Sequence, residues 1–220
     1  MATLRILVAD DHDLVRKGVR ALVEEHGWEV AAEARDGREA VEKAQQIKPD
    51  IAILDISMPS LNGLDAAKQI VQLVPRTKVL VLTMHDADPL IRQVLATGAR
   101  GYLLKSDVAR DLVSAVDALH RNETFFTHKV AQVLLDGYLG KLPVNEGNAN
   151  KEGESLRLTD RQREIVQLLA EGKSSKEVAV VLGVSVKTAE THRVNIMRRL
   201  NCHSVTELVR YAIRNHIIEA

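Results

Sequence analysis

Five short apolar runs alternate with five amphipathic segments in the first part of the chain, and this alternation limits the possible folds more than any other feature. The runs span residues 4–9, 28–34, 50–54, 79–83 and 101–104. Each is four to seven residues long, which suits a strand that is buried on both faces. Between the runs, apolar residues recur at helical spacing. The pattern predicts a doubly wound α/β domain with a five-stranded parallel sheet over residues 1–122.

The remainder of the chain follows a different pattern. One more helical stripe, at about residues 127–140, precedes a polar stretch with proline, glycine and asparagine, so we predict a linker over residues 123–154. Beyond the linker only helical patterns occur. They open at residues that suit helix N-caps, namely Thr159, Ser174, Ser185 and Ser204. Residues 155–220 are therefore expected to form an all-α four-helix domain.

Charge is distributed unevenly between these parts. The whole chain carries 30 basic and 30 acidic side chains, but residues 155–220 hold 11 basic and 7 acidic ones. This excess of basic residues hints that the C-terminal part binds a polyanion. The single cysteine, Cys202, excludes an intrachain disulfide and a thiolate metal cluster. Neither a secretion signal nor a membrane-spanning stretch is evident, so we expect a cytoplasmic protein with no membrane partner.

Polar residues follow the strands of the predicted sheet. Asp10 and Asp11 come after the first strand, Asp55 ends the third, Thr83 ends the fourth, and Lys105 follows the fifth. Open parallel sheets bind their ligands beyond the carboxyl ends of the strands, so these groups are expected to converge. Carboxylates gathered in one place repel one another unless a cation joins them. Because the ligands are oxygens, the cluster predicts a Mg²⁺ site.

These residue types also suit phosphoryl transfer. A carboxylate can attack a phosphoryl group to give an aspartyl phosphate, and Asp55 is the candidate because it ends the most apolar central strand. Asp10 and Asp11 would then hold the metal. Lys105 would supply a second positive charge, and the hydroxyl of Thr83 could bond a phosphoryl oxygen.

The motifs in residues 3–122 resemble the receiver domain of two-component response regulators, which has a flavodoxin-like fold. They are Asp10-Asp11, Ile53-Leu54-Asp55-Ile56-Ser57-Met58-Pro59, Asn62-Gly63-Leu64-Asp65, Thr83 and Tyr102-Leu103-Leu104-Lys105. The resemblance implies that a sensor histidine kinase phosphorylates Asp55. It also implies that the backbone carbonyl of Ser57 completes the Mg²⁺ shell, and that Thr83 and Tyr102 form the switch.

The sequence departs from the receiver pattern in two places. Ser106 follows the lysine where many receivers have a proline, so the cis peptide associated with that proline cannot form. Met84 follows the switch threonine where many receivers have a small residue. A bulky side chain beside the phosphoryl group could restrict access by water, so we hypothesise slow dephosphorylation.

A short helix, a turn at residues 183–185 and a longer helix form the pattern of a helix-turn-helix within residues 174–200. One face of the longer helix carries cationic, hydrogen-bonding and small apolar side chains, and the other carries Ala189, Ile196 and Leu200. The first face suits phosphates and base edges. Its members are Lys187, Glu190, Thr191, Val194 and Arg198.

Residues 155–218 resemble the LuxR-type DNA-binding domain of the NarL/FixJ subfamily. The matching stretches are Leu158 to Glu164, Gly172 to Ala179 and Ser185 to Leu200. The resemblance implies that the bases are contacted by Glu190, Thr191 and Val194, and the phosphates by Lys187, Thr188, Arg193 and Arg198. His192 is as consistent with packing as with DNA contact. The last helix, at about residues 204–216, would be a dimerisation surface.

Together the two resemblances imply a phosphorylation-dependent transcriptional regulator and not an enzyme. Its partners would be a histidine kinase, double-stranded promoter DNA, a second copy of the chain and RNA polymerase. One alternative is a phosphorylation-independent regulator with a vestigial receiver. A phosphatase or phosphotransferase would have a second aspartate where Ser57 stands, and a ligand-sensing LuxR-type regulator fits poorly with an aromatic content of 3%.

Overall fold

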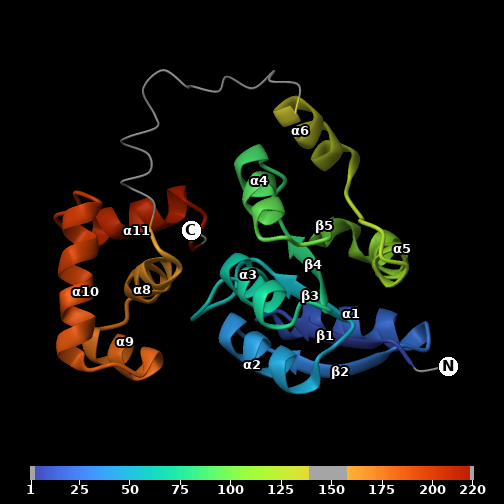
Figure 1. Ribbon diagram of the computed structural model, residues 1–220, viewed down its shortest axis with the longest axis horizontal. Coiled ribbons are helices and arrows are strands. Elements are labelled where there is room, and N and C mark those ends of the chain that lie inside the picture. The colour runs from blue at the N-terminus through green and yellow to red at the C-terminus, as the bar shows by residue number, and fades with distance from the viewer. Residues whose placement is uncertain (1–2, 139–157, 219–220) are drawn as a thin grey trace. The chain divides into compact units, whose positions relative to one another are not determined.

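The computed structural model describes residues 3–138 and 158–218 (Figure 1). The chain divides into two compact units, Met1–Leu142 and Pro143–Ala220, each described below by itself. The polar part of the predicted linker lies outside the described residues. In the described ranges no helix is both long and apolar enough to cross a membrane.

The first unit contains the predicted five-stranded parallel sheet, with strand order β2-β1-β3-β4-β5. The strands are β1 (Arg5–Ala9), β2 (Glu29–Ala34), β3 (Ile51–Asp55), β4 (Lys78–Thr83) and β5 (Gly101–Leu104). The helices are α1 (Asp13–Glu25), α2 (Gly37–Ile47), α3 (Gly63–Leu73), α4 (Asp88–Ala96) and α5 (Val108–His120), with a short 3₁₀ helix, η1 (Lys105–Asp107), before α5. The doubly wound fold predicted from the alternating pattern is confirmed.

Helices cover both faces of the sheet. Apolar residues of α2, α3 and α4 pack on one face, and those of α1 and α5 pack on the other. All residues of the central strand β3 are therefore buried. Burial on both faces explains why the strands appear in the sequence as continuous apolar runs and not as an alternating pattern. It also fixes Asp55, the last residue of β3, at the edge of the core.

The helix that the sequence places within the linker, α6 (His128–Tyr138), packs on the first unit. Val130 is fully buried and Val133 is 7% exposed, and both belong to the core cluster that includes α4. The chain reaches α6 by running beside β5, because the backbone of Phe125 bonds to Tyr102 and to Arg100. These contacts give the apolar stripe of α6 a surface on which to pack.

The second unit is the expected bundle of helices. They are α8 (Asp160–Ala170), α9 (Ser175–Leu182), α10 (Val186–Arg199) and α11 (Val205–Arg214). Each of the four predicted N-cap residues caps its helix through its side chain. Gly183 ends α9 with φ of +63°, a conformation that glycine adopts without strain. This left-handed residue turns the chain into α10 within two residues.

Candidate functional sites

Two buried carboxylates and one lysine meet at the carboxyl edge of the sheet. Asp10 follows β1, Asp55 ends the adjacent β3, and both are only 1% exposed. Lys105, at the start of η1, places its Nζ 2.9 Å from Asp10 Oδ2 and 2.9 Å from Asp55 Oδ1. The parallel register brings together groups that are far apart in the sequence, as the strand-end argument predicts.

The surroundings of Asp55 leave its negative charge incompletely balanced. Burial and the charge of Asp10 raise the pKa of Asp55 to about 6, although Lys105 and a backbone hydrogen bond from Ser57 act in the opposite direction. Asp55 Oδ2 is buried and has no hydrogen-bond partner within the described residues. A buried carboxylate oxygen without a partner is costly, so this atom favours a cation or a reaction that consumes the charge.

The cluster extends to Asp11 and His12 on its solvent side. The Asp11 side chain is 33% exposed, and His12 Nδ1 lies 2.8 Å from Asp11 Oδ1 and 3.5 Å from Asp10 Oδ1. One potential ligand atom from each of Asp10, Asp11, His12 and Asp55 lies within 4.8 Å of the others. This donor set could hold a metal ion. His12 is not among the site residues predicted from the sequence, although it directly follows the acidic pair.

Arg16 on α1 also belongs to the site, and the sequence pattern did not predict it. Its side chain is buried, and Nη1 donates to the backbone carbonyl of Asp10 at 2.7 Å. Its Nε donates to Glu33 on β2 at 3.0 Å. Arg16 therefore ties the end of β1 to β2 and fixes the backbone that carries Asp10. An arginine on a helix is usually exposed, so its position in the sequence gives no signal of this role.

Thr83 and Tyr102 meet at one backbone carbonyl. Thr83 Oγ1 donates to the carbonyl of His85 at 3.2 Å and accepts from the His85 N–H at 3.1 Å. The Tyr102 hydroxyl donates to the same carbonyl at 2.5 Å. Burial and the charge of Asp86 raise the pKa of Tyr102 to about 12, so this hydroxyl keeps its proton at neutral pH. The structure thus joins Thr83 and Tyr102 to the β4–α4 loop and not to the carboxylates.

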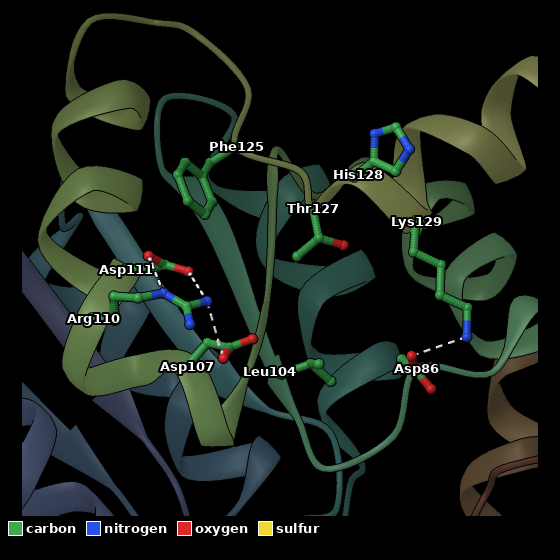
Figure 2. Close-up of a pocket in the computed structure, with 9 residues that line it drawn as sticks. All are labelled: Asp86, Leu104, Asp107, Arg110, Asp111, Phe125, Thr127, His128 and Lys129. Atoms are coloured by element: carbon green, nitrogen blue, oxygen red, sulfur yellow. Dashed lines mark hydrogen bonds and ion pairs between the residues drawn. The ribbon is translucent and has the colours of Figure 1, made fainter.

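A pocket of about 360 Å³ lies between η1, the start of α5 and the start of α6 (Figure 2). It contains none of the acidic-cluster residues. Leu104 and Phe125 contribute apolar surface. The charged side chains around it are paired with one another: Arg110 with Asp107 and Asp111, and Lys129 with Asp86. The Lys129–Asp86 pair joins α6 to the β4–α4 loop, which also carries His85.

In the second unit, α10 presents a polar face to solvent. Ala189 and Ile196 are buried in the bundle, as predicted, while Val194 on the opposite side is 54% exposed. Arg193 is partly buried. The remaining residues expected to contact DNA are exposed, namely Lys187, Thr188, Glu190, Thr191 and Arg198.

Some of these side chains already have partners within the helix. The hydroxyl of Thr188 bonds to Ser185 Oγ at 2.7 Å, and Thr191 Oγ1 donates to the carbonyl of Lys187 at 2.8 Å. Within the described residues, the charged groups of Lys187, Glu190 and Arg198 have no ion pair or hydrogen bond. The face therefore offers both cations and an acid to a ligand without breaking internal contacts.

Comparison with known families assigns both parts of the chain. Residues 6–117 match the response regulator receiver domain, and residues 156–212 match the bacterial regulatory proteins of the luxR family. Oxygen regulatory protein NreC from Staphylococcus carnosus is 39% identical over 220 residues, covering 98% of this chain and all of that protein. NreC from Staphylococcus epidermidis is 37% identical over 218 residues, with the same coverage.

Solved structures agree with this assignment. A LuxR-family two-component response regulator from Aurantimonas is 32% identical, with a TM-score of 0.58, and covers 63% of this chain and 99% of its own. An RcsB–DNA complex is 26% identical, with a TM-score of 0.57, and covers 97% of this chain and 99% of its own. The chain therefore belongs to the two-component response regulators that combine a receiver domain with a LuxR-type DNA-binding domain, a family of transcriptional regulators.

Proposed function

We propose that a sensor histidine kinase transfers a phosphoryl group to Asp55 and that this modification controls the binding of α10 to promoter DNA. The observation that carries the proposal is the state of Asp55, which is buried beside Lys105 and Asp10 with one carboxylate oxygen unpartnered. A carboxylate oxygen of Asp55 is expected to attack phosphorus. Lys105 lies close enough to balance charge on the phosphoryl oxygens.

Mg²⁺ suits the same cluster. Asp10, Asp11 and Asp55 would hold the ion with the backbone carbonyl of Ser57, because hard divalent cations prefer oxygen ligands. The orphaned Oδ2 of Asp55 supports this fit. When bound, Mg²⁺ would neutralise the phosphoryl oxygens. Asp10 and Asp11 then act as ligands and not as acid or base groups.

The switch would run through the carbonyl of His85. To reach a phosphoryl group on Asp55, the hydroxyl of Thr83 must give up its bonds to the His85 backbone. Tyr102 donates to the same carbonyl and would change its position with the loop. Lys129 of α6 pairs with Asp86 in this loop at 2.9 Å, so a loop movement would alter the docking of α6. Phosphorylation would shift an existing equilibrium between the two arrangements.

The domain assignment uses the boundaries predicted from the sequence. We assign residues 1–122 to the receiver, 123–154 to the connecting segment that includes α6, and 155–220 to the DNA-binding domain. Activation would produce a homodimer that matches a two-fold site on DNA and acts on RNA polymerase. Such partners place the proposed action in the cytoplasm.

The first test is the oligomeric state of the full-length protein in Mg²⁺ with and without beryllofluoride, a phosphoryl mimic, measured by light scattering after size exclusion. Wild type is expected to shift from monomer to dimer, and Asp55→Asn is not. The matched control is Asp111→Asn, which alters an acid of α5 outside the cluster and should shift like wild type.

Other outcomes would favour other functions. No shift in wild type would favour the phosphorylation-independent regulator. A dimer in all samples would mean that the switch acts on DNA geometry instead of assembly. Turnover of a phosphomonoester by the wild-type protein would favour the alternative that the chain is a phosphatase or phosphotransferase.

Met84 is expected to protect the phosphoryl group. It follows Thr83 directly, and its side chain is 65% exposed, so truncating it opens a path for water without removing core packing. Met84→Ala should speed dephosphorylation by about fivefold, which corresponds to roughly 1 kcal/mol in the barrier. The measurement is the loss of radiolabelled phosphoryl groups. Leu73→Ala, another exposed apolar truncation, should keep the wild-type rate, and an unchanged rate in Met84→Ala would refute the hypothesis.

The exposed face of α10 predicts two kinds of DNA-binding defect. Glu190→Ala should weaken binding to the preferred DNA site by about 1–3 kcal/mol and should relax the sequence preference. The reason is that the acid can accept a hydrogen bond from a cytosine amino group. Arg198→Ala should weaken binding to DNA of any sequence by the same factor. It should also reduce the slope of log affinity against log salt concentration by about 1. Fluorescence anisotropy with specific and scrambled duplexes measures both. Equal salt slopes for the two variants would contradict these roles.

A further inference from the structure

We propose that Arg161 and Gln162, in the first turn of α8, position α10 for reading the DNA sequence and do not contact DNA themselves. The inference rests on the proposed function in one respect, that α10 is the helix that contacts the bases. It goes beyond that function because it assigns part of the sequence preference to two residues that lie outside α10.

Apolar packing alone leaves the orientation of α10 weakly defined. Within α10, all of whose residues the structure describes, Ala189 and Ile196 are the buried side chains. Met197 and Leu200 pack against the same core but are only partly buried. α8 packs against both α9 and α10 (Figure 1). Apolar burial has no directional preference, whereas a hydrogen bond requires a particular geometry, so polar contacts from α8 can fix how α10 is turned.

Arg161 holds the turn that leads into α10. Its Nη2 donates to the backbone carbonyl of Leu182 at 2.8 Å. Leu182 is the last residue of α9, where the final carbonyls lack partners within the helix, and Gly183 then turns the chain towards α10. Nη1 of Arg161 donates to Glu164 at 2.6 Å, and the Glu164 side chain is only 9% exposed. The planar guanidinium therefore joins the end of α9 to a nearly buried acid of α8.

Gln162 holds the opposite end of α10. Arg199, the last residue of α10, donates from Nη1 to Gln162 Oε1 at 3.2 Å. The same oxygen accepts the backbone N–H of Thr159 at 3.0 Å, and this bond is part of the capping box of α8. The oxygen that meets Arg199 is therefore itself fixed by the backbone of α8. Two neighbouring residues of one turn thus contact the segment before α10 and its last residue.

A small rotation of α10 affects base contacts and phosphate contacts differently. Hydrogen bonds to base edges depend on distance and angle, so they weaken when the helix turns. Contacts to phosphates carry no sequence information and supply most of the non-specific binding through long cationic side chains. Loss of either contact from α8 should therefore lower the affinity for the preferred DNA much more than the affinity for DNA of unrelated sequence.

The test measures binding of the full-length protein to two duplexes by fluorescence anisotropy, in Mg²⁺ and beryllofluoride. One duplex is selected from a random pool with the wild-type protein, and the other has the same composition in scrambled order. Arg161→Met should lower the affinity for the selected duplex by about tenfold and for the scrambled duplex by less than about twofold. The slope of log affinity against log salt concentration should stay as in wild type, because no phosphate contact is lost.

Two substitutions of Gln162 form a matched pair. Gln162→Glu keeps an acceptor for Thr159 and Arg199 and retains the capping-box pattern, so the ratio of the two affinities should stay as in wild type. Gln162→Ala removes the acceptor and should lower this ratio in the same direction as Arg161→Met.

Arg121→Met is the control for the loss of one positive charge. Arg121 lies in the first unit, where it pairs with Glu123 at 3.0 Å, so its replacement should leave the ratio of affinities unchanged. Thermal unfolding followed by circular dichroism checks that each variant is folded at the temperature of the binding assay.

The other possible results have separate meanings. An equal fall in affinity for both duplexes, with a smaller salt slope, would overturn the inference in favour of a phosphate contact from Arg161. Lower thermal stability with an unchanged ratio of affinities would overturn it in favour of a role in folding alone. If Glu190→Ala lost the preference while Arg161→Met kept it, only this inference would fail. Failure of wild type to enrich any sequence from the pool would overturn both the inference and the DNA contacts of the proposed function.

Discussion

Asp55→Asn is expected to stabilise the metal-free protein by about 3 kcal/mol at pH 7 and by only about 0.5 kcal/mol at pH 4. The pKa of Asp55 is raised from 3.8 to about 6 by burial and by the charge of Asp10. Each pKa unit corresponds to about 1.36 kcal/mol between the two states, and the side chain is only 1% exposed. Asparagine removes the charge and keeps the shape.

The sign follows from proton binding. Between pH 3.8 and about 6 the unfolded chain has released the Asp55 proton while the folded chain still holds it. The stability contributed by Asp55 is therefore fully present only at pH values well below 3.8, and it is lost as the pH rises through about 6. Above about pH 6 both states carry the ionised carboxylate, so the loss in the free energy of unfolding of wild type no longer changes with pH. Urea unfolding in chelator at pH 4, 5, 6 and 7 measures the free-energy difference between the variant and wild type.

A control variant and the addition of Mg²⁺ both test this prediction. Arg110 hydrogen-bonds Asp111 and lowers its pKa, so Asp111→Asn should show no gain in stability as the pH rises. Adding Mg²⁺ should stabilise wild type but not Asp55→Asn, because the ion would occupy the position next to the free oxygen. An Asp55→Asn advantage as large at pH 4 as at pH 7 would show that desolvated charge is not its cause.

Features that depend on local chemistry could be predicted from the sequence. A side-chain oxygen at Thr159, Ser174, Ser185 or Ser204 satisfies a backbone N–H two or three residues later, whatever the rest of the fold does. The strands were equally recognisable, since burial on both faces requires a continuous apolar run. Convergence of Asp10, Asp55 and Lys105 then follows from the geometry of a parallel sheet.

Features that depend on a packing partner could not be predicted. The stripe of Val130 and Val133 shows that α6 must bury one face, but not that the face lies with α4 in the core of the first unit. Arg16 looks like a surface residue until its contact with the carbonyl of Asp10 is known. Likewise, Thr83 and Tyr102 are adjacent to the site in the family pattern, but their meeting point at the His85 carbonyl depends on a loop conformation.

Lys105→Met is expected to destabilise the metal-free protein by about 3–5 kcal/mol at pH 7, the cost typical of breaking a buried ion pair. The Lys105 side chain is 9% exposed and lies 2.9 Å from two carboxylates that are each 1% exposed. Methionine keeps the length of the side chain but leaves Asp10 and Asp55 without a cation. Proton uptake by one of them at lower pH should relieve the repulsion, so the loss should shrink towards pH 4.

Lys129→Met provides a contrast at the same distance. Lys129 Nζ also lies 2.9 Å from a carboxylate, that of Asp86, but the two side chains are 45% and 54% exposed. Solvent screens this pair, so its loss should leave the free energy of unfolding nearly unchanged. Equal effects of the two substitutions in urea unfolding would contradict the assignment of the Lys105 effect to burial.

The double variant Asp55→Asn/Lys105→Met separates repulsion from lost packing. With Asp55 neutral, removing Lys105 leaves one buried carboxylate, Asp10, instead of two that repel each other. The cost of Lys105→Met should therefore be smaller in the Asp55→Asn background than in wild type, and the difference measures the coupling between the two residues. A cost that is the same in both backgrounds would mean that Lys105 stabilises the fold through its pairing with Asp10 or through packing, and not by balancing the charge of Asp55.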